Sequence, residues 1–215
     1  MEKRFVKSRE IFLATGAIIV WFSVIAQLYL VLVNRSTPLS EVLIRFFSYF
    51  TIQTNILTGT CLTTLLLRPT SAWGNFFSGN KVLTAICSYI AFVGIAYSIL
   101  LRNLWHPTGL QQIVDELLHS VNPAIFILFW LIFVSKAGLQ WKNVLPWLIY
   151  PIIYFIYILI RGALSGAYPY PFVDVNEIGY KRMFINDLGL IIAFLLLSLV
   201  FIAIGKMIRR KLLSN

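Results

Sequence analysis

Charged residues are scarce in this sequence of 215 residues. Asp, Glu, Lys and Arg together make up 12% of it, whereas hydrophobic residues make up 59%. A soluble globular domain carries about 25% charged residues. The charges also cluster, so long uncharged runs separate them. No loop between these runs is long enough to form a large water-soluble domain, and the pattern is typical of a protein that crosses a membrane several times.

Cysteine and histidine are scarce too, with two residues of each. Cys61 and Cys87 lie inside uncharged runs, so the sequence contains no disulfide framework, and we interpret both as small core residues. A metal-dependent hydrolase needs several ligands that converge on the ion, and two separated histidines, His106 and His119, are too few. We therefore expect neither a metal ion nor another cofactor.

Six runs contain no Asp, Glu, Lys or Arg, and each can cross, or nearly cross, a hydrocarbon core of about 30 Å as a helix. They are Ile11–Val33, Phe46–Leu67, Val82–Leu101, Leu117–Val134, Val144–Ile160 and Leu188–Gly205. The sequence lacks the alternating segments of about ten residues that form outer-membrane barrels. We therefore predict an all-α fold with one domain, residues 1–215, formed by a six-helix transmembrane bundle. Gly162 and Gly166, spaced as GxxxG, predict a close contact between helices.

The distribution of charge predicts the orientation of these spans. An even number of spans places both termini on one side of the membrane. If that side is the cytoplasm, it receives twelve of the 18 Lys and Arg residues but two of the eight acidic residues. The positive-inside rule therefore predicts cytoplasmic termini. This topology and contact with anionic lipids explain the net charge of +10, and we expect no nucleic-acid partner.

The stretch "FFSYFTIQTNIL" places polar residues inside the second uncharged run. Thr51, Asn55 and Thr58 share one helix face because they are spaced i, i+4 and i+7, and Thr54 borders that face. The face should point into the bundle, since unsatisfied polar groups are costly in lipid. It fits either hydrogen bonds that join helices or a reaction site.

His119 lies near the outer end of the fourth run, and an ionisable residue inside a span is a candidate functional residue. The second and fourth runs both cross inward, so we expect Thr51 and His119 at similar depths in the outer half of the membrane. A hydroxyl beside an imidazole is the minimal pair of nucleophile and base. The alternative is a histidine that fixes packing by bonding to a carbonyl, and the spacing alone leaves both open.

Three short blocks, in this order, resemble the androgen-induced, or androgen-dependent TFPI-regulating, family of small multi-span membrane proteins and their bacterial relatives. They are Tyr49-Phe50-Thr51, His119 followed by "SVNPAIFILF", and "SGAYPYPF" at Ser165–Phe172. Together they cover positions 49–172. The spacing from His119 to Pro123 is one residue shorter than in the family.

The resemblance implies an intramembrane threonine hydrolase that cleaves fatty acid esters of hydroxy fatty acids. It implies Thr51 as the nucleophile and His119 as the general base, in a multi-pass protein of a bacterial plasma membrane. For substrate binding we expect Asn55 and Asn122 to donate to the oxyanion and Arg161 to bind a fatty-acid carboxylate. The alternatives are amides that bridge helices and an arginine that extends to the membrane surface.

Two further assignments stay open in the sequence. Asp115, one turn before His119, and Asp187, at the start of the last run, are both candidates to orient the imidazole, and both also fit interfacial charges. Thr54 carries a hydroxyl close to Thr51 and is an alternative nucleophile.

Other functional classes fit less well. A rhomboid-like serine protease needs Gly-x-Ser-Gly, whereas Ser165-Gly166 completes Gly-x-x-Ser-Gly and no histidine follows it. A small proton-coupled carrier would use His119, Arg161 and Asp187 as a relay, but the sequence shows no inverted repeat. A non-enzymatic lipid-binding protein is the third possibility. The expected partners are therefore the bilayer and a lipid or fatty-acid ester, and the oligomeric state stays open.

Overall fold

The structure is a computed structural model that describes residues 2–104 and 106–214. These residues form helices joined by short loops, and none of them lies in a β-strand. Within the described residues, six helices are long and apolar enough to cross a membrane: Arg4–Val33, Phe50–Leu67, Asn80–Leu101, Gly109–Phe133, Trp141–Ser165 and Val175–Ser214. The predictions of an all-α protein and of six such helices are confirmed.

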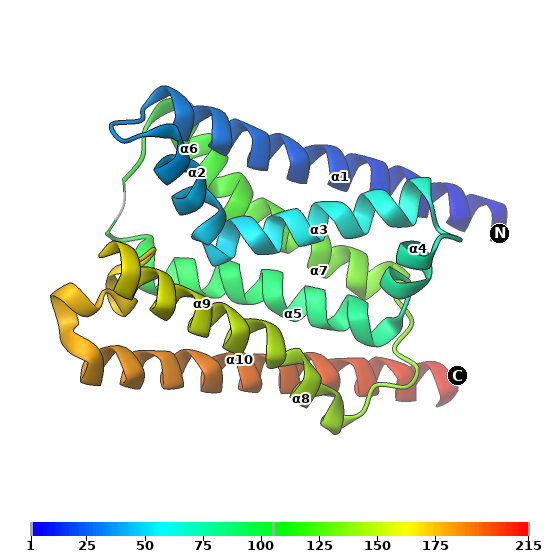
Figure 1. The fold of residues 1–215 in the computed structure, drawn as a ribbon. Helices are drawn as coiled ribbons and strands as arrows, with labels where there is room; N and C mark the ends of the chain where they lie inside the picture. Colours follow the sequence, from blue (N-terminus) through cyan, green and yellow to red (C-terminus); the bar gives the residue numbers. More distant parts are fainter. Residues whose placement is uncertain (1, 105, 215) are drawn as a thin grey trace. The chain divides into compact units, whose positions relative to one another are not determined.

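The chain divides into two compact units, Met1–Gly138 and Leu139–Asn215. The helices of the first unit are α1 (Glu2–Val33), α2 (Leu39–Ser48), α3 (Phe50–Leu67), α4 (Ala72–Phe77), α5 (Asn80–Ala96), α6 (Gly109–Glu116) and α7 (Asn122–Phe133), with π-helical turns η1 (Tyr97–Leu101) and η2 (Leu117–Val121). In this unit α1 packs along α3, α3 against α5, and α5 against α7 (Figure 1). Its core includes Leu62, Ile90 and Trp130, all fully buried.

The second predicted span is interrupted in the structure. We expected one continuous helix from Phe46 to Leu67, but Tyr49 adopts an extended backbone (φ −78°, ψ 126°) that separates α2 from α3. The side-chain amide of Gln53 donates to the carbonyl of Phe47 at 2.9 Å and so satisfies an acceptor at the break. Thr51 consequently lies in the first turn of α3 and not inside a long helix.

The two π-helical turns were not predicted either. Pro123 has no N–H group, so it cannot bond to the carbonyl of His119 in an α-helical pattern, and η2 occupies this position. Gly94 of α5 lies against the same carbonyl, since a Cβ atom there would be 2.9 Å from the oxygen of His119 and 3.2 Å from Cγ of Pro123. The missing side chain of Gly94 therefore allows α5 to approach η2 closely.

The second unit contains η3 (Trp141–Asn143), α8 (Val144–Trp147), α9 (Ile149–Ser165), η4 (Pro171–Val173) and α10 (Val175–Ser214). We expected Gly162 and Gly166 to allow a close contact between helices, but among the described residues the structure places neither against another helix. A Cβ atom on Gly162 would lie 2.0 Å from the ring of Tyr168, so Gly162 packs against the following loop. Gly166 ends α9 in the left-handed conformation (φ 69°). The two glycines therefore allow the chain to turn after α9 and the following loop to fold back onto this helix.

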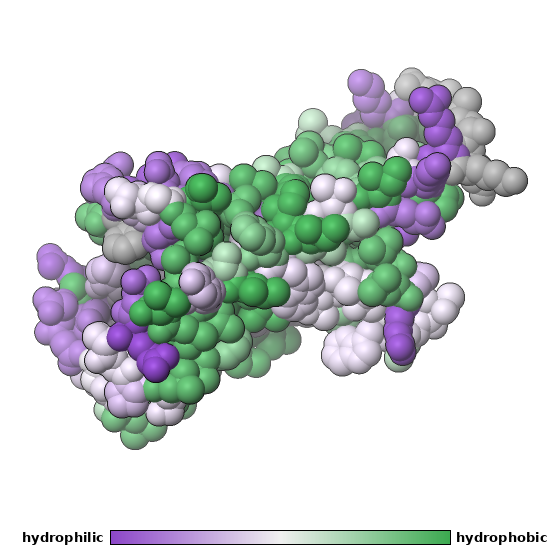
Figure 2. Space-filling view, turned by 90° about the horizontal axis from the view of Figure 1, so that it is seen from above, coloured by the Kyte–Doolittle hydropathy of each residue, from purple (hydrophilic) through white to green (hydrophobic). Residues whose placement is uncertain are grey.

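Large apolar side chains remain on the surface of the long helices. On α1 the exposed ones include Ile11, Ile18, Phe22 and Ile25. Figure 2 shows hydrophobic residues on much of the surface that it draws. Apolar side chains exposed along long helices are typical of a surface in contact with lipid chains.

Candidate active site

Thr51 and His119, which are 68 positions apart, lie in contact. The hydroxyl Oγ1 of Thr51 is 3.4 Å from Nε2 of His119, and both residues are partly buried. Thr51 comes from the first turn of α3, and His119 from the π-helical turn η2. The distance is at the long end for a hydrogen bond, which is common at catalytic contacts without substrate. The structure thus brings together the two residues that the sequence singled out.

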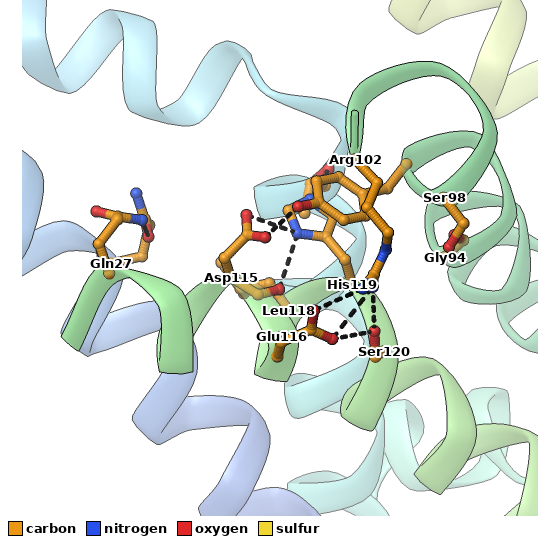
Figure 3. A network of polar contacts seen from close by, with 12 residues as sticks. Gln27, Gly94, Ser98, Arg102, Asp115, Glu116, Leu118, His119 and Ser120 are labelled. Carbon is orange, nitrogen blue, oxygen red and sulfur yellow. Dashed lines mark hydrogen bonds and ion pairs between the residues drawn. The ribbon is translucent and has the colours of Figure 1, made fainter. Parts of the chain in front are cut away.

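The other ring nitrogen of His119 faces Asp115. Nδ1 is 2.9 Å from the backbone carbonyl oxygen of Asp115 and 3.2 Å from its carboxylate Oδ1 (Figure 3). Two acceptors at Nδ1 favour the tautomer that carries its proton there, which leaves the lone pair of Nε2 directed at Thr51. Of the two acids considered for orienting the imidazole, Asp115 makes this contact. Asp187 belongs to α10, in the second unit.

Tyr97, the first residue of η1, contacts both His119 and Asp115. Its ring stacks on the imidazole of His119, with centroids 3.9 Å apart and planes inclined by 14°. Its hydroxyl donates a hydrogen bond to Oδ2 of Asp115. Nothing in the sequence singled out Tyr97, because this contact depends on how α5 packs against η2 and leaves no local pattern.

A second polar cluster, formed by Arg102, Glu116 and Ser120, lies next to the first (Figure 3). Arg102 donates to both carboxylate oxygens of Glu116, at 2.7 and 3.1 Å, and to the hydroxyl of Ser120 at 2.9 Å. Ser120 in turn donates to Glu116 at 2.6 Å. The hydrogen bonds that Arg102 donates to Glu116 raise the pKa of the Arg102 guanidinium above its ordinary value. The cluster therefore connects Arg102, which follows η1, to Glu116, which precedes η2, and to Ser120, which lies in η2.

The two amides predicted as oxyanion donors are fully buried and bond within the bundle. Asn55 donates to the carbonyls of Thr51 at 2.8 Å and Leu118 at 3.3 Å. Asn122 donates to Oδ1 of Asn55 at 2.7 Å and to the hydroxyl of Ser23 at 2.8 Å. Either amide can turn an N–H towards an oxyanion only by giving up one of these bonds. In the structure both amides bridge helices, which was the alternative interpretation.

The remaining candidates lie in different surroundings. Thr54 is fully buried, and its carbonyl accepts the hydroxyl of Thr58 at 2.8 Å. Arg161, in the second unit, is buried and donates to the carbonyl of Ala167 at 2.6 Å. His106 is an exposed loop residue. Thr51 is therefore the threonine that combines partial exposure with a contact to the imidazole.

Within residues 2–104 and 106–214, no group of three or more His, Cys, Asp or Glu side chains is arranged to hold a metal ion. Comparison of the chain with family models, with curated proteins and with solved structures finds no match. The function is therefore inferred from the geometry of the site and from the sequence blocks described above.

Proposed function

We propose that this chain is a membrane-embedded hydrolase of lipid carboxylic esters, with Thr51 as the nucleophile and His119 as the general base. The observation that supports it best is the arrangement of the imidazole, with Nε2 at the hydroxyl of Thr51 and Nδ1 at Asp115. The same spatial arrangement, a nucleophile beside a base that a third group orients, recurs in hydrolases of unrelated folds. The family resemblance narrows the proposed substrate to fatty acid esters of hydroxy fatty acids.

The geometry supports a two-step reaction. In the first step Nε2 of His119 accepts the proton of Thr51, and Oγ1 attacks the ester carbonyl carbon. Asp115 stabilises the imidazolium that forms. When the tetrahedral intermediate collapses, the bond to the leaving alkoxy oxygen breaks, His119 donates its proton to that oxygen, and an acyl-threonine remains. In the second step His119 deprotonates a water molecule, which attacks the acyl carbon. The bond from that carbon to Oγ1 of Thr51 then breaks, His119 returns the proton to Oγ1, and the fatty acid is released.

The position of Thr51 at the start of α3 adds an electrostatic contribution. The N-terminus of a helix carries the positive end of the macrodipole, which favours negative charge within the first turn. The alkoxide of Thr51 and the oxyanion of the intermediate would both develop there. The break at Tyr49 is therefore part of the proposed mechanism, because a continuous helix from Phe46 would place Thr51 about one turn further from a helix end.

A membrane location suits this substrate. Six apolar helices and their exposed apolar faces support a multi-pass membrane protein, and the charge distribution supports cytoplasmic termini. The site would then lie in the outer half of a bacterial plasma membrane. Two long acyl chains would pack against apolar walls while the ester meets the single polar spot.

The test is hydrolysis of a fatty acid ester of a hydroxy fatty acid by the detergent-purified protein. Thr51→Val keeps the shape of the side chain but removes the hydroxyl, and we expect kcat to fall by at least about 10³-fold, as for His119→Ala. Thr54→Val is the matched control and should retain activity. An inactive wild type on a broad panel of esters, or an active Thr51→Val, would contradict the proposal.

Covalent labelling separates this proposal from the carrier and the lipid-binding protein. A fluorophosphonate probe should label the wild type and Thr54→Val but not Thr51→Val, because the probe reacts with an activated hydroxyl. A carrier or a lipid-binding protein has no such hydroxyl, and equal labelling of all three proteins would exclude Thr51 as the nucleophile.

A further inference from the structure

Two π-helical turns face each other at the site. Tyr97 begins η1 and His119 lies at the centre of η2, while α5, which leads into η1, packs against η2. A π-helical turn adds one residue to the helical repeat, so it redirects the side chains around it, and such turns occur frequently at functional sites. Here the redirected side chains are the two rings that stack. This juxtaposition is independent of whether Thr51 is a nucleophile.

The stack restrains the imidazole. With nearly parallel planes and centroids 3.9 Å apart, the ring of His119 cannot rotate about its Cβ–Cγ bond without striking the ring of Tyr97. Tyr97 is itself buried, with 5% of its surface exposed, so it cannot move aside easily. Arg102 lies over the Tyr97 ring at 5.3 Å and is held by Glu116, which adds a cation–π contact to the restraint.

The hydroxyl of Tyr97 restrains the other partner of His119. Oδ2 of Asp115 accepts the hydrogen bond from Tyr97, while Oδ1 faces Nδ1 of His119 at 3.2 Å. One carboxylate is therefore shared between the two rings, with one oxygen for each. A buried carboxylate needs such donors, because an unsatisfied buried charge is costly.

We propose that Tyr97 is a positioning residue for the proposed Thr51–His119 pair. Its ring fixes the plane of the imidazole, and its hydroxyl fixes the carboxylate of Asp115 that holds the proton on Nδ1. Nε2 then remains an acceptor directed at Thr51. The catalytic consequence rests on the proposed function, but the effect of Tyr97 on the imidazole does not.

The first experiment observes the imidazole directly. Protein labelled with ¹⁵N-histidine in detergent micelles has two histidine side chains, and the His106→Gln variant assigns them. In the wild type we expect one sharp set of His119 signals with the proton on Nδ1. Tyr97→Phe keeps the stack and loses the hydroxyl, so the signals of the two tautomers should mix. Tyr97→Leu loses both restraints and should also broaden them.

The control is Tyr89→Phe, which removes the hydroxyl of a different buried tyrosine, in the preceding helix α5. It should leave the His119 signals unchanged. If Tyr97→Phe also leaves them unchanged, the proposal is wrong, and this result holds whether or not the protein hydrolyses esters. Because Tyr97→Phe preserves the ring, the test survives a failure of Tyr97→Leu to fold.

The second experiment uses activity on the ester. We expect Tyr97→Phe to lower kcat about tenfold and Tyr97→Leu about a hundredfold, with KM unchanged, because positioning acts on the transition state. Combined with His119→Ala, neither substitution should lower the remaining activity further, since both act through the imidazole. A further fall of equal size in the double variants would show that Tyr97 acts independently of His119, and would overturn the proposal.

Discussion

The two units of the chain bury polar side chains in different ways. In the first unit a chain of hydrogen bonds joins Ser23, Asn122 and Asn55 across three helices, although Oδ1 of Asn122 has no hydrogen-bond partner among the described residues. In the second unit Oδ2 of Asp187 and Oγ of Ser198 are buried with no hydrogen-bond partner among the described residues. Both units are apolar and helical, but the connected network of buried polar groups belongs to the first.

This difference favours the first unit as the location of the proposed reaction. A buried polar network is stabilising when its members satisfy one another, whereas an isolated buried group costs free energy. The first unit fixes Thr51 and His119 through such a network, which a reaction site requires. The second unit carries a buried carboxylate that contributes to no such arrangement among the described residues. Three pairs of substitutions, one member in each unit, test this contrast.

The largest effect is expected from the two aspartates. In Asp115→Asn the amide nitrogen can face Nδ1 of His119, which favours the tautomer with the proton on Nε2 and leaves no acceptor for the hydroxyl of Thr51. We expect kcat for ester hydrolysis to fall by about 10³-fold or more with KM nearly unchanged, as when other triads lose their acid. Steady-state kinetics of the purified variant measures both constants.

The matched change is Asp187→Asn, which also neutralises a buried carboxylate. It should change kcat by less than about twofold, because the imidazole is held by Asp115 and Tyr97 of the first unit. If Asp187→Asn abolishes activity and Asp115→Asn does not, the contrast between the units is wrong and the relay of a carrier becomes the better interpretation.

Composition and spacing were sufficient to predict the six apolar helices, and they showed that Thr51 and His119 could meet. Uncharged runs are a strong signal because a charged side chain is costly in lipid. The contact followed from the expected topology, in which the second and fourth spans run in the same direction and place Thr51 and His119 at similar depths. The choice of Asp115 over Asp187 did not follow, because it depends on how the helices pack.

The other differences arise where backbone and packing act together. Nothing in the local composition marks the break at Tyr49, which Gln53 stabilises by bonding to Phe47. Pro123 was the available signal for η2, but a proline inside a helix also fits a simple kink. Tyr97 became visible only once α5 and η2 were in place, because 22 positions separate it from His119.

The next pair of substitutions concerns stability. Asn122→Ala leaves Oδ1 of Asn55 without its donor and opens a cavity between α1, α3 and α7. We expect the free energy of unfolding to fall by about 3 kcal/mol. Ser198→Ala in α10 removes a buried hydroxyl that has no partner in the described part of the chain, so it should leave stability unchanged or raise it by up to about 1 kcal/mol. Denaturation in detergent micelles, followed by circular dichroism, compares the two.

The smallest pair of effects comes from two glycines in helices. A Cβ atom on Gly94 would lie 2.9 Å from the carbonyl oxygen of His119, so Gly94→Ala must push α5 away from η2. We expect a loss of about 1–2 kcal/mol of stability from this overpacking, together with broadened His119 signals. A Cβ atom on Gly189 of α10 would meet no other atom of the described residues within 4 Å, so Gly189→Ala should gain about 0.5–1 kcal/mol from helix propensity.

If Gly94→Ala is as harmless as Gly189→Ala, the close approach of α5 does not hold the stacked rings in place. The imidazole would then depend on the hydroxyl of Tyr97 alone, and Tyr97→Phe should have the same effect as Tyr97→Leu.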